Sequence, residues 1–174
     1  MPEVPPAFLE GLSQLQIELE EGELDRLGRF LDLLFEANAV MNLTGIRERD
    51  IAWNRHVLDS LTLVPLIEAS AAKRVLDLGS GGGFPGFILA ILGYPTVKLI
   101  ESNGKKCTFL RNVSRLLGVE VEVIHSRIEN YRPLKQATYI TSRALAPLEK
   151  LLAYSEPLLS PYGRCFFLKG ANAE

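Results

Sequence analysis

The sequence predicts an α/β fold of the Rossmann-like type, with a mostly parallel sheet, helices on both faces and an N-terminal helical cap. From residue 74 onward, short apolar runs alternate with stretches of helical spacing, a pattern typical of a parallel sheet with crossover helices. A glycine-rich run over residues 77–86 directly follows the first apolar run. Glycines at this point let the backbone turn tightly and approach a ligand. The fold prediction therefore includes a nucleotide-cofactor site.

The N-terminal part, residues 1–72, is expected to form the helical cap. Leucines recur at three- and four-residue steps within residues 21–40, which predicts an amphipathic helix with its acidic residues outside. A shorter helix is predicted over residues 6–15. Residues 49–68 again show helical spacing, and Pro65 is expected to kink or end that helix because proline lacks the backbone N–H.

Residues 73–174 are expected to form the core, in one compact unit with the cap. The predicted strands cover residues 74–78, 97–101, 121–125, 139–142 and 163–169. The predicted helices cover residues 86–92, 105–117 and 148–158, with Gly93 and Gly118 as C-terminal stops. An edge hairpin commonly closes such a sheet, but only five residues follow Lys169. We therefore expect the closing strands at the C-terminus to be missing.

The composition is that of a soluble globular protein. Of the 174 residues, 47% are hydrophobic and 23% are charged, which is ordinary usage. The two cysteines, Cys107 and Cys165, lack CxxC spacing, so neither a zinc site nor a disulfide framework is predicted. The N-terminus is acidic, and no apolar run approaches the roughly 18 residues of a membrane span. These features predict a cytoplasmic protein with no membrane partner, and a monomer by default.

Charge is distributed unevenly along the chain. Residues 1–40 hold nine acidic and two basic residues, whereas residues 41–174 hold twelve acidic and seventeen basic ones. Within residues 98–143, nine bases outnumber four acids. A local excess of this kind can hold phosphates even when the whole protein is acidic. A solvated face with scattered counter-charges would produce the same pattern.

The glycine-rich run departs from the dinucleotide-binding fingerprint. In that fingerprint, Gly-x-Gly-x-x-Gly, the third glycine allows close packing beside a pyrophosphate, and here that position is Phe84. Asp77 precedes the first glycine by two residues and suits the cationic amino-acid part of S-adenosylmethionine better than a pyrophosphate. Glu101 ends the next apolar run, 22 residues after Gly79, where a carboxylate can bind both hydroxyls of a ribose. A nicotinamide dinucleotide and a turn without a ligand remain alternatives.

Two elements after later strands fit the methionine cofactor. Ile128 and Glu129 follow the third predicted strand, where an apolar and an acidic side chain suit the face and the exocyclic amine of adenine. Core packing of Ile128 and a helix N-terminal role for Glu129 are the alternatives. After the fourth strand, Arg143 offers a planar cation that can bind a phosphate, stack on a base or orient the cofactor. A structural ion pair is the alternative for Arg143.

An ordered set of motifs runs through most of the chain: Asn42–Thr44, Arg55–Leu61, Asp77–Gly86, Glu101–Lys106, Ser126–Glu129, Ser142–Ala144 and Lys169–Gly170. Together these motifs resemble the bacterial small-subunit (16S) rRNA guanine-N7 methyltransferases, the GidB or RsmG family. The resemblance implies an S-adenosylmethionine-dependent methyltransferase sheet. It also implies methyl transfer from S-adenosylmethionine to N7 of one guanine in the small-subunit rRNA.

The resemblance also assigns roles to residues. The expected cofactor-binding residues are Asp77, Gly79, Gly81, Phe84, Glu101, Ser102, Ile128, Glu129 and Arg143. The residues expected to line the RNA side are Lys105, Lys106, Arg127 and Lys169. No metal and no catalytic side chain are expected, because guanine N7 carries a free lone pair and no proton. Alignment of the two reactants can supply the acceleration.

Four residues near the end of the cap have no assigned role: Arg55, His56, Asp59 and Ser60. His56, Asp59 and Ser60 share one face of the predicted helix. We favour a structural role for His56, joining the cap to the core, over a substrate contact. The substrate is expected to be free rRNA, the 30S subunit or an assembly intermediate. A shortened relative that binds cofactor or RNA without turnover is a further alternative.

Overall fold

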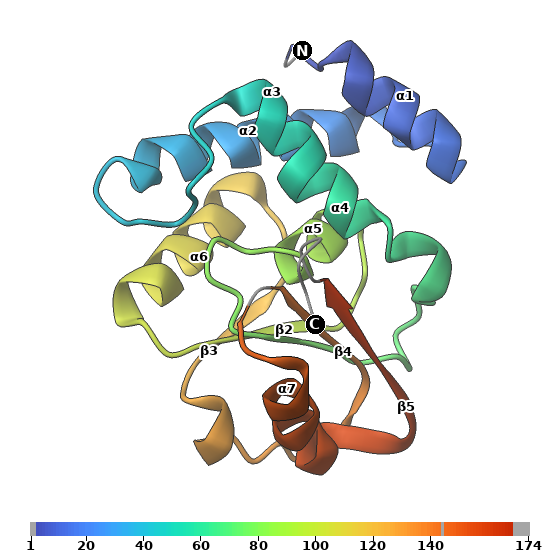
Figure 1. Ribbon diagram of the computed structural model, residues 1–174, viewed down its shortest axis with the longest axis vertical. Helices are drawn as coiled ribbons and strands as arrows, with labels where there is room; N and C mark the ends of the chain where they lie inside the picture. Colours follow the sequence, from blue (N-terminus) through green and yellow to red (C-terminus); the bar gives the residue numbers. More distant parts are fainter. Residues whose placement is uncertain (1–2, 144, 169–174) are drawn as a thin grey trace.

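A five-stranded sheet lies at the centre of the computed structural model, which describes residues 3–143 and 145–168 (Figure 1). Its strands are β1 (Val75–Leu78), β2 (Val97–Glu101), β3 (Glu122–His125), β4 (Ala137–Arg143) and β5 (Leu159–Leu168). They lie in the order β3-β2-β1-β4-β5, and each neighbouring pair is parallel. The predicted Rossmann-like parallel sheet is confirmed.

Helices cover both faces of this sheet. The core helices are α5 (Gly86–Ile91), α6 (Gly104–Leu117) and α7 (Leu148–Ser155), with 3-10 turns at Ile128–Asn130 and Glu156–Leu158. Figure 1 shows α7 on the opposite face from α5 and α6. The chain runs from β1 outward to β2 and β3, then returns to β4 on the other side of β1. Such a reversal leaves a crevice for a ligand at the carboxyl ends of the strands.

All regular secondary structure described in the N-terminal cap is helical. It consists of α1 (Pro6–Leu15), α2 (Glu21–Asn38), α3 (Arg49–Ala52), a π-helical segment (Trp53–Leu58), α4 (Asp59–Leu61) and a 3-10 turn (Val64–Leu66). The helix predicted over residues 49–68 is therefore interrupted by the π-helical segment and ends as an α-helix at Leu61. Pro65 occupies the first turn of the 3-10 segment, where its missing N–H leaves no hydrogen bond unmade.

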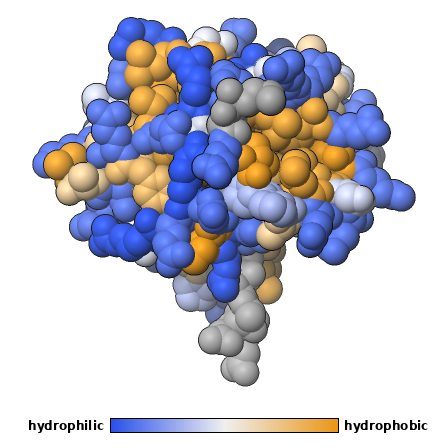
Figure 2. Space-filling model, turned by 90° about the horizontal axis from the view of Figure 1, so that it is seen from above, coloured by the Kyte–Doolittle hydropathy of each residue, from blue (hydrophilic) through white to orange (hydrophobic). Residues whose placement is uncertain are grey.

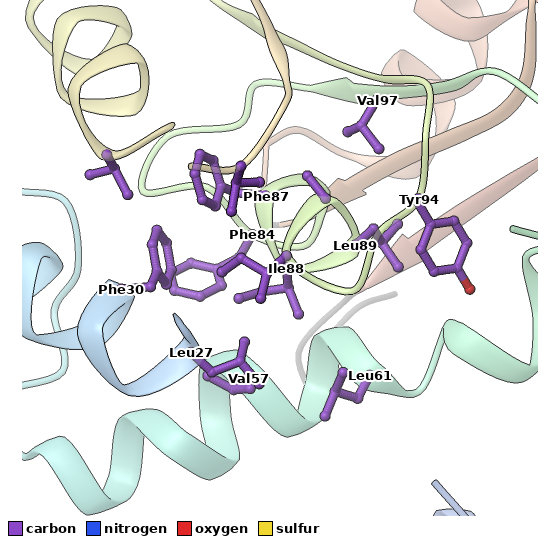
Figure 3. Close-up of a cluster of buried hydrophobic side chains, with 14 of the residues drawn as sticks. Leu27, Phe30, Val57, Leu61, Phe84, Phe87, Ile88, Leu89, Tyr94 and Val97 are labelled. Carbon is purple, nitrogen blue, oxygen red and sulfur yellow. The ribbon is translucent and has the colours of Figure 1, made fainter. Parts of the chain in front are cut away.

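One hydrophobic cluster packs the cap against the sheet (Figure 3). The buried ring of Phe30, from α2, stacks on Phe87 of α5 with centroids 5.1 Å apart. Phe30 also meets Phe84 edge-on at 5.3 Å. Such ring pairs add about 0.5–1.5 kcal/mol beyond their burial. Val57 and Leu61 belong to the same cluster. The cap therefore contacts the glycine-rich run directly, through Phe84.

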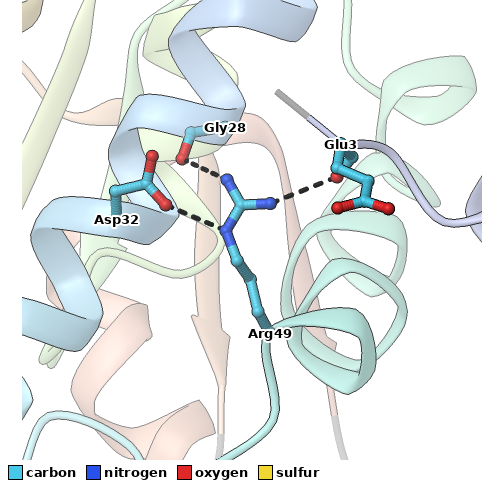
Figure 4. Close-up of polar contacts among 4 residues, drawn as sticks. All are labelled: Glu3, Gly28, Asp32 and Arg49. Carbon is cyan, nitrogen blue, oxygen red and sulfur yellow. Dashed lines mark hydrogen bonds and ion pairs between the residues drawn. The ribbon is translucent and has the colours of Figure 1, made fainter. Parts of the chain in front are cut away.

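Arg49 links three segments of the cap by hydrogen bonds from its side chain (Figure 4). Its Nε donates to Oδ1 of Asp32, on α2, at 2.9 Å. The two terminal nitrogens donate to the backbone oxygens of Gly28 at 3.1 Å and Glu3 at 3.2 Å. The guanidinium also lies 5.8 Å from the centroid of the Trp53 ring. The N-terminal segment, α2 and α3 are thus joined at one side chain.

We expect Arg49→Ala to lower the free energy of unfolding by about 1–3 kcal/mol, because a carboxylate and two carbonyls lose their donor. Calorimetry should record a fall in Tm of about 2–8 °C. Lys73→Ala is the control, since it removes only an exposed 3.6 Å ion pair with Glu68 and should cost less than about 0.5 kcal/mol. Equal losses in the two variants would contradict this role of Arg49.

Two boundaries in the core differ by three or more residues from the sequence predictions, whereas the other described core boundaries differ by at most two. The helix predicted over residues 148–158 ends at Ser155 and tightens into the 3-10 turn Glu156–Leu158. The strand predicted from residue 163 begins earlier, at Leu159. Pro161 and Gly163 disfavour strand structure, but they are tolerated because β5 lies at one edge of the sheet that the described residues form. Lys169, the predicted end of that strand, lies outside the described residues.

The face seen in Figure 2 carries hydrophobic side chains in separate patches between hydrophilic ones. Exposed apolar residues in the described part of the cap include Leu9, Val40, Ile51 and Leu66. In residues 3–143 and 145–168, no helix is both long enough and apolar enough to cross a membrane.

Candidate functional site

The glycine-rich run forms a loop at the carboxyl end of β1. Ser80 donates its backbone N–H to the oxygen of Ile100, in β2, at 3.0 Å, and a tight turn follows in which Gly83 N–H donates to Ser80 O at 2.7 Å. Gly79 has a φ of +66°, in the left-handed region that side chains rarely adopt. A Cβ at Gly79 would lie 2.5 Å from Cδ1 of Leu145. The backbone therefore favours glycine there, and a side chain at this position would displace Leu145.

Glu101 ends β2 and fixes the shape of this loop. The residue is 7% exposed, and its two carboxylate oxygens accept from different backbone amides. Oε1 accepts from the N–H of Gly81 at 3.0 Å, and Oε2 accepts from the N–H of Asn103 at 2.9 Å. A carboxylate has about four lone-pair sites, so each oxygen keeps one for a ligand. Glu101 can therefore shape the loop and bind a diol at the same time.

A cavity of about 130 Å³ opens beside Glu101. Its lining residues are Gly79, Ile100, Glu101, Ser102, Ser126, Arg127, Ile128, Glu129, Leu145 and Tyr154. Of the nine predicted cofactor-binding residues, the five that line it are Gly79, Glu101, Ser102, Ile128 and Glu129. Apolar side chains and acidic groups therefore meet where the first three strands end. This combination suits a flat heteroaromatic base that carries a diol.

Four lining residues are not among the predicted site residues: Ile100, Ser126, Leu145 and Tyr154. Leu145 follows β4 and leans over Gly79, whereas Tyr154 reaches the cavity from α7 and donates its hydroxyl proton to Oε1 of Glu129 at 3.0 Å. Hydrogen bonds from the backbone of Glu129 and from Tyr154 hold the pKa of the exposed Glu129 carboxyl below its usual range. Neither Leu145 nor Tyr154 belongs to a short motif. Only the position of Leu145 directly after the Ser-Arg-Ala element pointed toward the site.

Phe84 and Arg143, two further predicted cofactor contacts, lie at the junction with the cap. The Phe84 ring stacks on the ring of His56, with centroids 4.5 Å apart and an interplanar angle of 21°. Cζ of Arg143 lies 5.3 Å from the Phe84 centroid. Arg143 donates to the backbone oxygen of Arg55 at 3.0 Å and to Nδ1 of His56 at 2.5 Å. The guanidinium thus bridges β4 and the π-helical segment.

Asp77 lies beneath the loop with no exposed surface. Its Oδ1 accepts from the hydroxyl of Thr141 at 2.7 Å, whereas Oδ2 is buried without a hydrogen bond of good geometry among the described residues. Burial raises the pKa of Asp77 to about 6. An ionised carboxylate in this position costs stability, and perturbed groups of this kind are frequent at functional sites. A contact between Asp77 and the cationic end of a cofactor stays a prediction.

Three of the four predicted RNA-side residues, called the basic rim below, lie on the segments that follow β2 and β3: Arg127 lines the cavity itself, whereas Lys105 lines a separate groove between α2 and α6. Lys105 is exposed and Lys106 half-buried in the first turn of α6, and Arg127 is exposed after β3. The start of α6 lies next to the end of β3, because Nε2 of His125 lies 3.0 Å from the oxygen of Ser102. Lys169 lies outside the described residues. RNA binding by this rim stays a prediction.

The face shared by His56, Asp59 and Ser60 is divided between core and surface. His56 is 3% exposed and Ser60 is fully buried, with the Ser60 hydroxyl donating to the backbone oxygen of His56 at 2.7 Å. Asp59 is exposed. His56 contacts Thr44 as well as Arg143, as a residue joining the cap to the core would. No group of three or more His, Cys, Asp or Glu side chains in residues 3–143 and 145–168 could hold a metal.

The buried His56 predicts an acid-sensitive fold. Burial, and after it the charge of Arg143, lower the pKa of His56 to about 4, whereas an unfolded histidine titrates at about 6.5. As the pH falls, the unfolded chain therefore binds this proton at a higher pH than the folded chain does. As the pH falls from about 6.5 toward 4, we expect His56 to remove on the order of 2 kcal/mol of stability. The raised pKa of Asp77 acts in the opposite direction, because it makes the folded state bind its proton first.

Asp77 is present in both the wild-type chain and His56→Asn. Its contribution to the pH dependence of stability therefore cancels when the two are compared. Urea unfolding at about pH 7 and about pH 4.5 should show that the stability advantage of the wild type shrinks toward acid. A constant difference between the two chains across this range would contradict the lowered pKa of His56.

Comparison with known families and proteins gives a consistent result. The family model described as GidB, rRNA small subunit methyltransferase G, matches residues 23–174. A ribosomal RNA small subunit methyltransferase G from Paramagnetospirillum magneticum is 49% identical over 151 residues, which are 87% of this chain and 73% of that protein. The protein of the same name from Gluconobacter oxydans is 50% identical over 150 residues, 86% of this chain and 76% of that one.

Solved structures match the fold. Coclaurine N-methyltransferase, with N-methylheliamine and S-adenosylhomocysteine bound, superposes with a TM-score of 0.56 at 18% identity, covering 92% of this chain and 55% of that one. An S-adenosylmethionine-dependent methyltransferase from Thiobacillus denitrificans, in complex with S-adenosyl-L-homocysteine, gives 0.53 at 19% identity, covering 80% and 54%. At these identities the likeness concerns the fold alone, and it confirms the predicted Rossmann-like methyltransferase architecture.

Proposed function

The chain belongs to the GidB family of small-subunit rRNA methyltransferases, and from that premise we propose that it methylates N7 of one guanine in small-subunit rRNA. It is an S-adenosylmethionine-dependent enzyme, as the family match indicates. The family match over residues 23–174 is the observation that carries the proposal. It also favours S-adenosylmethionine over the nicotinamide dinucleotide that the glycine-rich run alone left open.

The cavity beside Glu101 fits the adenosine part of S-adenosylmethionine. Glu101 keeps free lone pairs for the two ribose hydroxyls, since each of its oxygens uses one on a backbone amide. Ile128 offers an apolar wall for adenine, and the carboxylate of Glu129 can accept from the exocyclic amine. Gly79 leaves room where any side chain would meet Leu145.

When bound, the cofactor supplies an electrophilic methyl group on a sulfonium centre. In the transfer, the lone pair of guanine N7 forms the new N–C bond as the S–C bond breaks, and no proton leaves N7. The residues of this chain therefore have to bind and align rather than to act as a base, and alignment can contribute about 7–11 kcal/mol. Glu101 and Ile128 would hold the adenosine end, and Arg143 would orient the cofactor at the cap junction.

We propose that the basic rim of Lys105, Lys106 and Arg127 holds the phosphates of the rRNA. These side chains are exposed or half-buried and carry no sequence information by themselves, so they would position the strand rather than select the base. An unpaired guanine could then be recognised on its exposed edges. Free rRNA in the cytoplasm, the 30S subunit and an assembly intermediate are the candidate substrates.

Nucleoside analysis of cellular rRNA tests this proposal. Small-subunit rRNA from cells without the gene should lack one 7-methylguanosine, and a plasmid copy of this chain should restore it. A copy carrying a disabling substitution in the glycine-rich run should not. Unchanged 7-methylguanosine after loss of the gene would contradict the proposed activity. Failure of the plasmid copy alone would instead favour a relative that binds without turnover.

A further inference from the structure

We propose that His56 is a positioning residue, which holds the guanidinium of Arg143 beside Phe84 by accepting its hydrogen bond. The inference rests on the proposed function, in which Arg143 orients the methyl donor. It assigns to the cap a part in cofactor binding, because His56 belongs to the π-helical segment of the cap whereas Arg143 ends β4. Segments of π-helix are frequent at functional sites.

The donor set around His56 determines which ring nitrogen carries the proton. A guanidinium can only donate hydrogen bonds, so Nδ1 of His56 must be unprotonated to accept from Arg143 at 2.5 Å. The proton of the neutral ring is then on Nε2. That nitrogen lies 2.6 Å from Oγ1 of Thr44 and donates to it. The two contacts thus fit one tautomer and exclude the imidazolium, which has no acceptor nitrogen.

A chain of paired polar groups fixes the ring from the other side. The side-chain oxygen of Asn38, the last residue of α2, accepts from the N–H groups of Leu43 at 2.7 Å and Thr44 at 2.9 Å. The amide nitrogen of Asn38 donates to the oxygen of Thr44 at 2.9 Å. Oγ1 of Thr44 also accepts from Ile46 N–H at 3.0 Å. These part-buried hydrogen bonds restrict where Thr44 can lie, so the end of α2 helps to fix the position of the His56 ring.

Within residues 3–143 and 145–168, the acceptor on His56 is one of two that hold Arg143. The other is the backbone oxygen of Arg55 at 3.0 Å. These contacts use two of the five N–H donors of the guanidinium, and other donors of the group can serve a ligand. A free arginine side chain samples many rotamers, and the second hydrogen bond and the Phe84 ring restrict Arg143 to few of them. Loss of the His56 acceptor would free this side chain.

A matched pair of substitutions separates the two contacts of His56. In His56→Asn, the side-chain oxygen occupies the place of Nδ1 and can still accept from Arg143. In His56→Gln, the longer amide reaches the place of Nε2 and keeps only the contact with Thr44. Both variants lose the ring that stacks on Phe84, so both should lose stability to a similar degree. A purely structural role would not distinguish them in cofactor binding.

Calorimetric titration with S-adenosylmethionine and steady-state methyl transfer to small-subunit rRNA provide the readouts. We expect His56→Gln to raise the Kd for S-adenosylmethionine by about tenfold or more, whereas His56→Asn should stay within about threefold of the wild type. The KM for rRNA should change in neither. Equal cofactor affinities in the two variants, or the reverse order, would overturn the inference. In an Arg143→Ala background, His56→Gln should have no further effect on affinity.

The tautomer can be measured whether or not the chain is active. The ¹⁵N chemical shifts of the His56 ring at about neutral pH should show an unprotonated Nδ1 and a protonated Nε2. A proton on Nδ1 would overturn the inference even in an active enzyme. A wild-type chain that shows the expected tautomer but binds no S-adenosylmethionine would instead contradict the proposed function.

Discussion

Gly79→Ala is expected to raise the Kd for S-adenosylmethionine by about 100-fold or more. The φ of +66° at Gly79 strains any residue with a Cβ, at a cost of about 1–2 kcal/mol. The added methyl group would also lie 2.5 Å from Leu145, so the Leu145 side chain has to move. Since Gly79 and Leu145 both line the cavity, the substitution changes the wall against which the cofactor packs. Calorimetric titration with S-adenosylmethionine measures the effect.

Gly118→Ala is a matched control for the backbone strain. Gly118 ends α6 with a φ of +62°, and a Cβ there would meet nothing within 4 Å. The two substitutions should therefore cost a similar amount of stability from strain, about 1–2 kcal/mol, but Gly118→Ala should leave cofactor affinity unchanged. Equal loss of affinity in both variants would show that strain in the fold, and not the cavity, controls binding.

Glu101→Ala should weaken both the loop and the cofactor site. The amides of Gly81 and Asn103 would lose a charged acceptor, and hydrogen bonds to charged groups contribute about 1.5–3 kcal/mol. We expect urea unfolding to show a loss of about 2 kcal/mol, and calorimetry a Kd for S-adenosylmethionine raised by about 100-fold. Glu101→Gln should lie between this variant and the wild type, because its single oxygen can serve only one of the two amides.

Glu122→Gln provides the comparison on the neighbouring strand. Glu122 begins β3 and forms an exposed ion pair with Lys98 at 2.9 Å, so its loss should change stability by less than about 0.5 kcal/mol and leave affinity unaltered. If Glu101→Ala kept the affinity of the wild type, Glu101 would have no part in binding the ribose. Its role would then be limited to holding the glycine-rich run.

The central strands and the glycine-rich run could be predicted from the sequence because their signals are local. The strand predicted over residues 97–101 is confirmed with the same bounds, since it is a short apolar run that ends at an acid. The start of β5 could not be predicted, because Pro161 and Gly163 disfavour a strand in the sequence. The strand forms there because it is hydrogen-bonded to β4. The π-helical segment was also missed. Its residues have ordinary helical spacing, and only packing against the core reveals the extra residue in the turn.

The candidate site was predictable where strand ends carry a motif and not where the fold brings single residues together. Glu101 ends one apolar run and the Ile128-Glu129 pair lies three residues after another, so their meeting at one edge of a parallel sheet could be predicted. Tyr154 lines the cavity from α7, and no motif surrounds it in the sequence. The contact between His56 and Arg143 joins positions 87 residues apart, and hydrogen bonds at that separation have no signature in one sequence.

The most direct test of the account is methyl transfer by the purified 174-residue chain. The protein would be incubated with small-subunit rRNA and S-adenosylmethionine carrying a deuterated methyl group, and the nucleosides analysed by mass spectrometry. We expect deuterated 7-methylguanosine, one methyl group per rRNA, in the wild type and little or none in Gly79→Ala. Deuterium in a different nucleoside, or wild-type protein that binds the cofactor and transfers nothing, would contradict it.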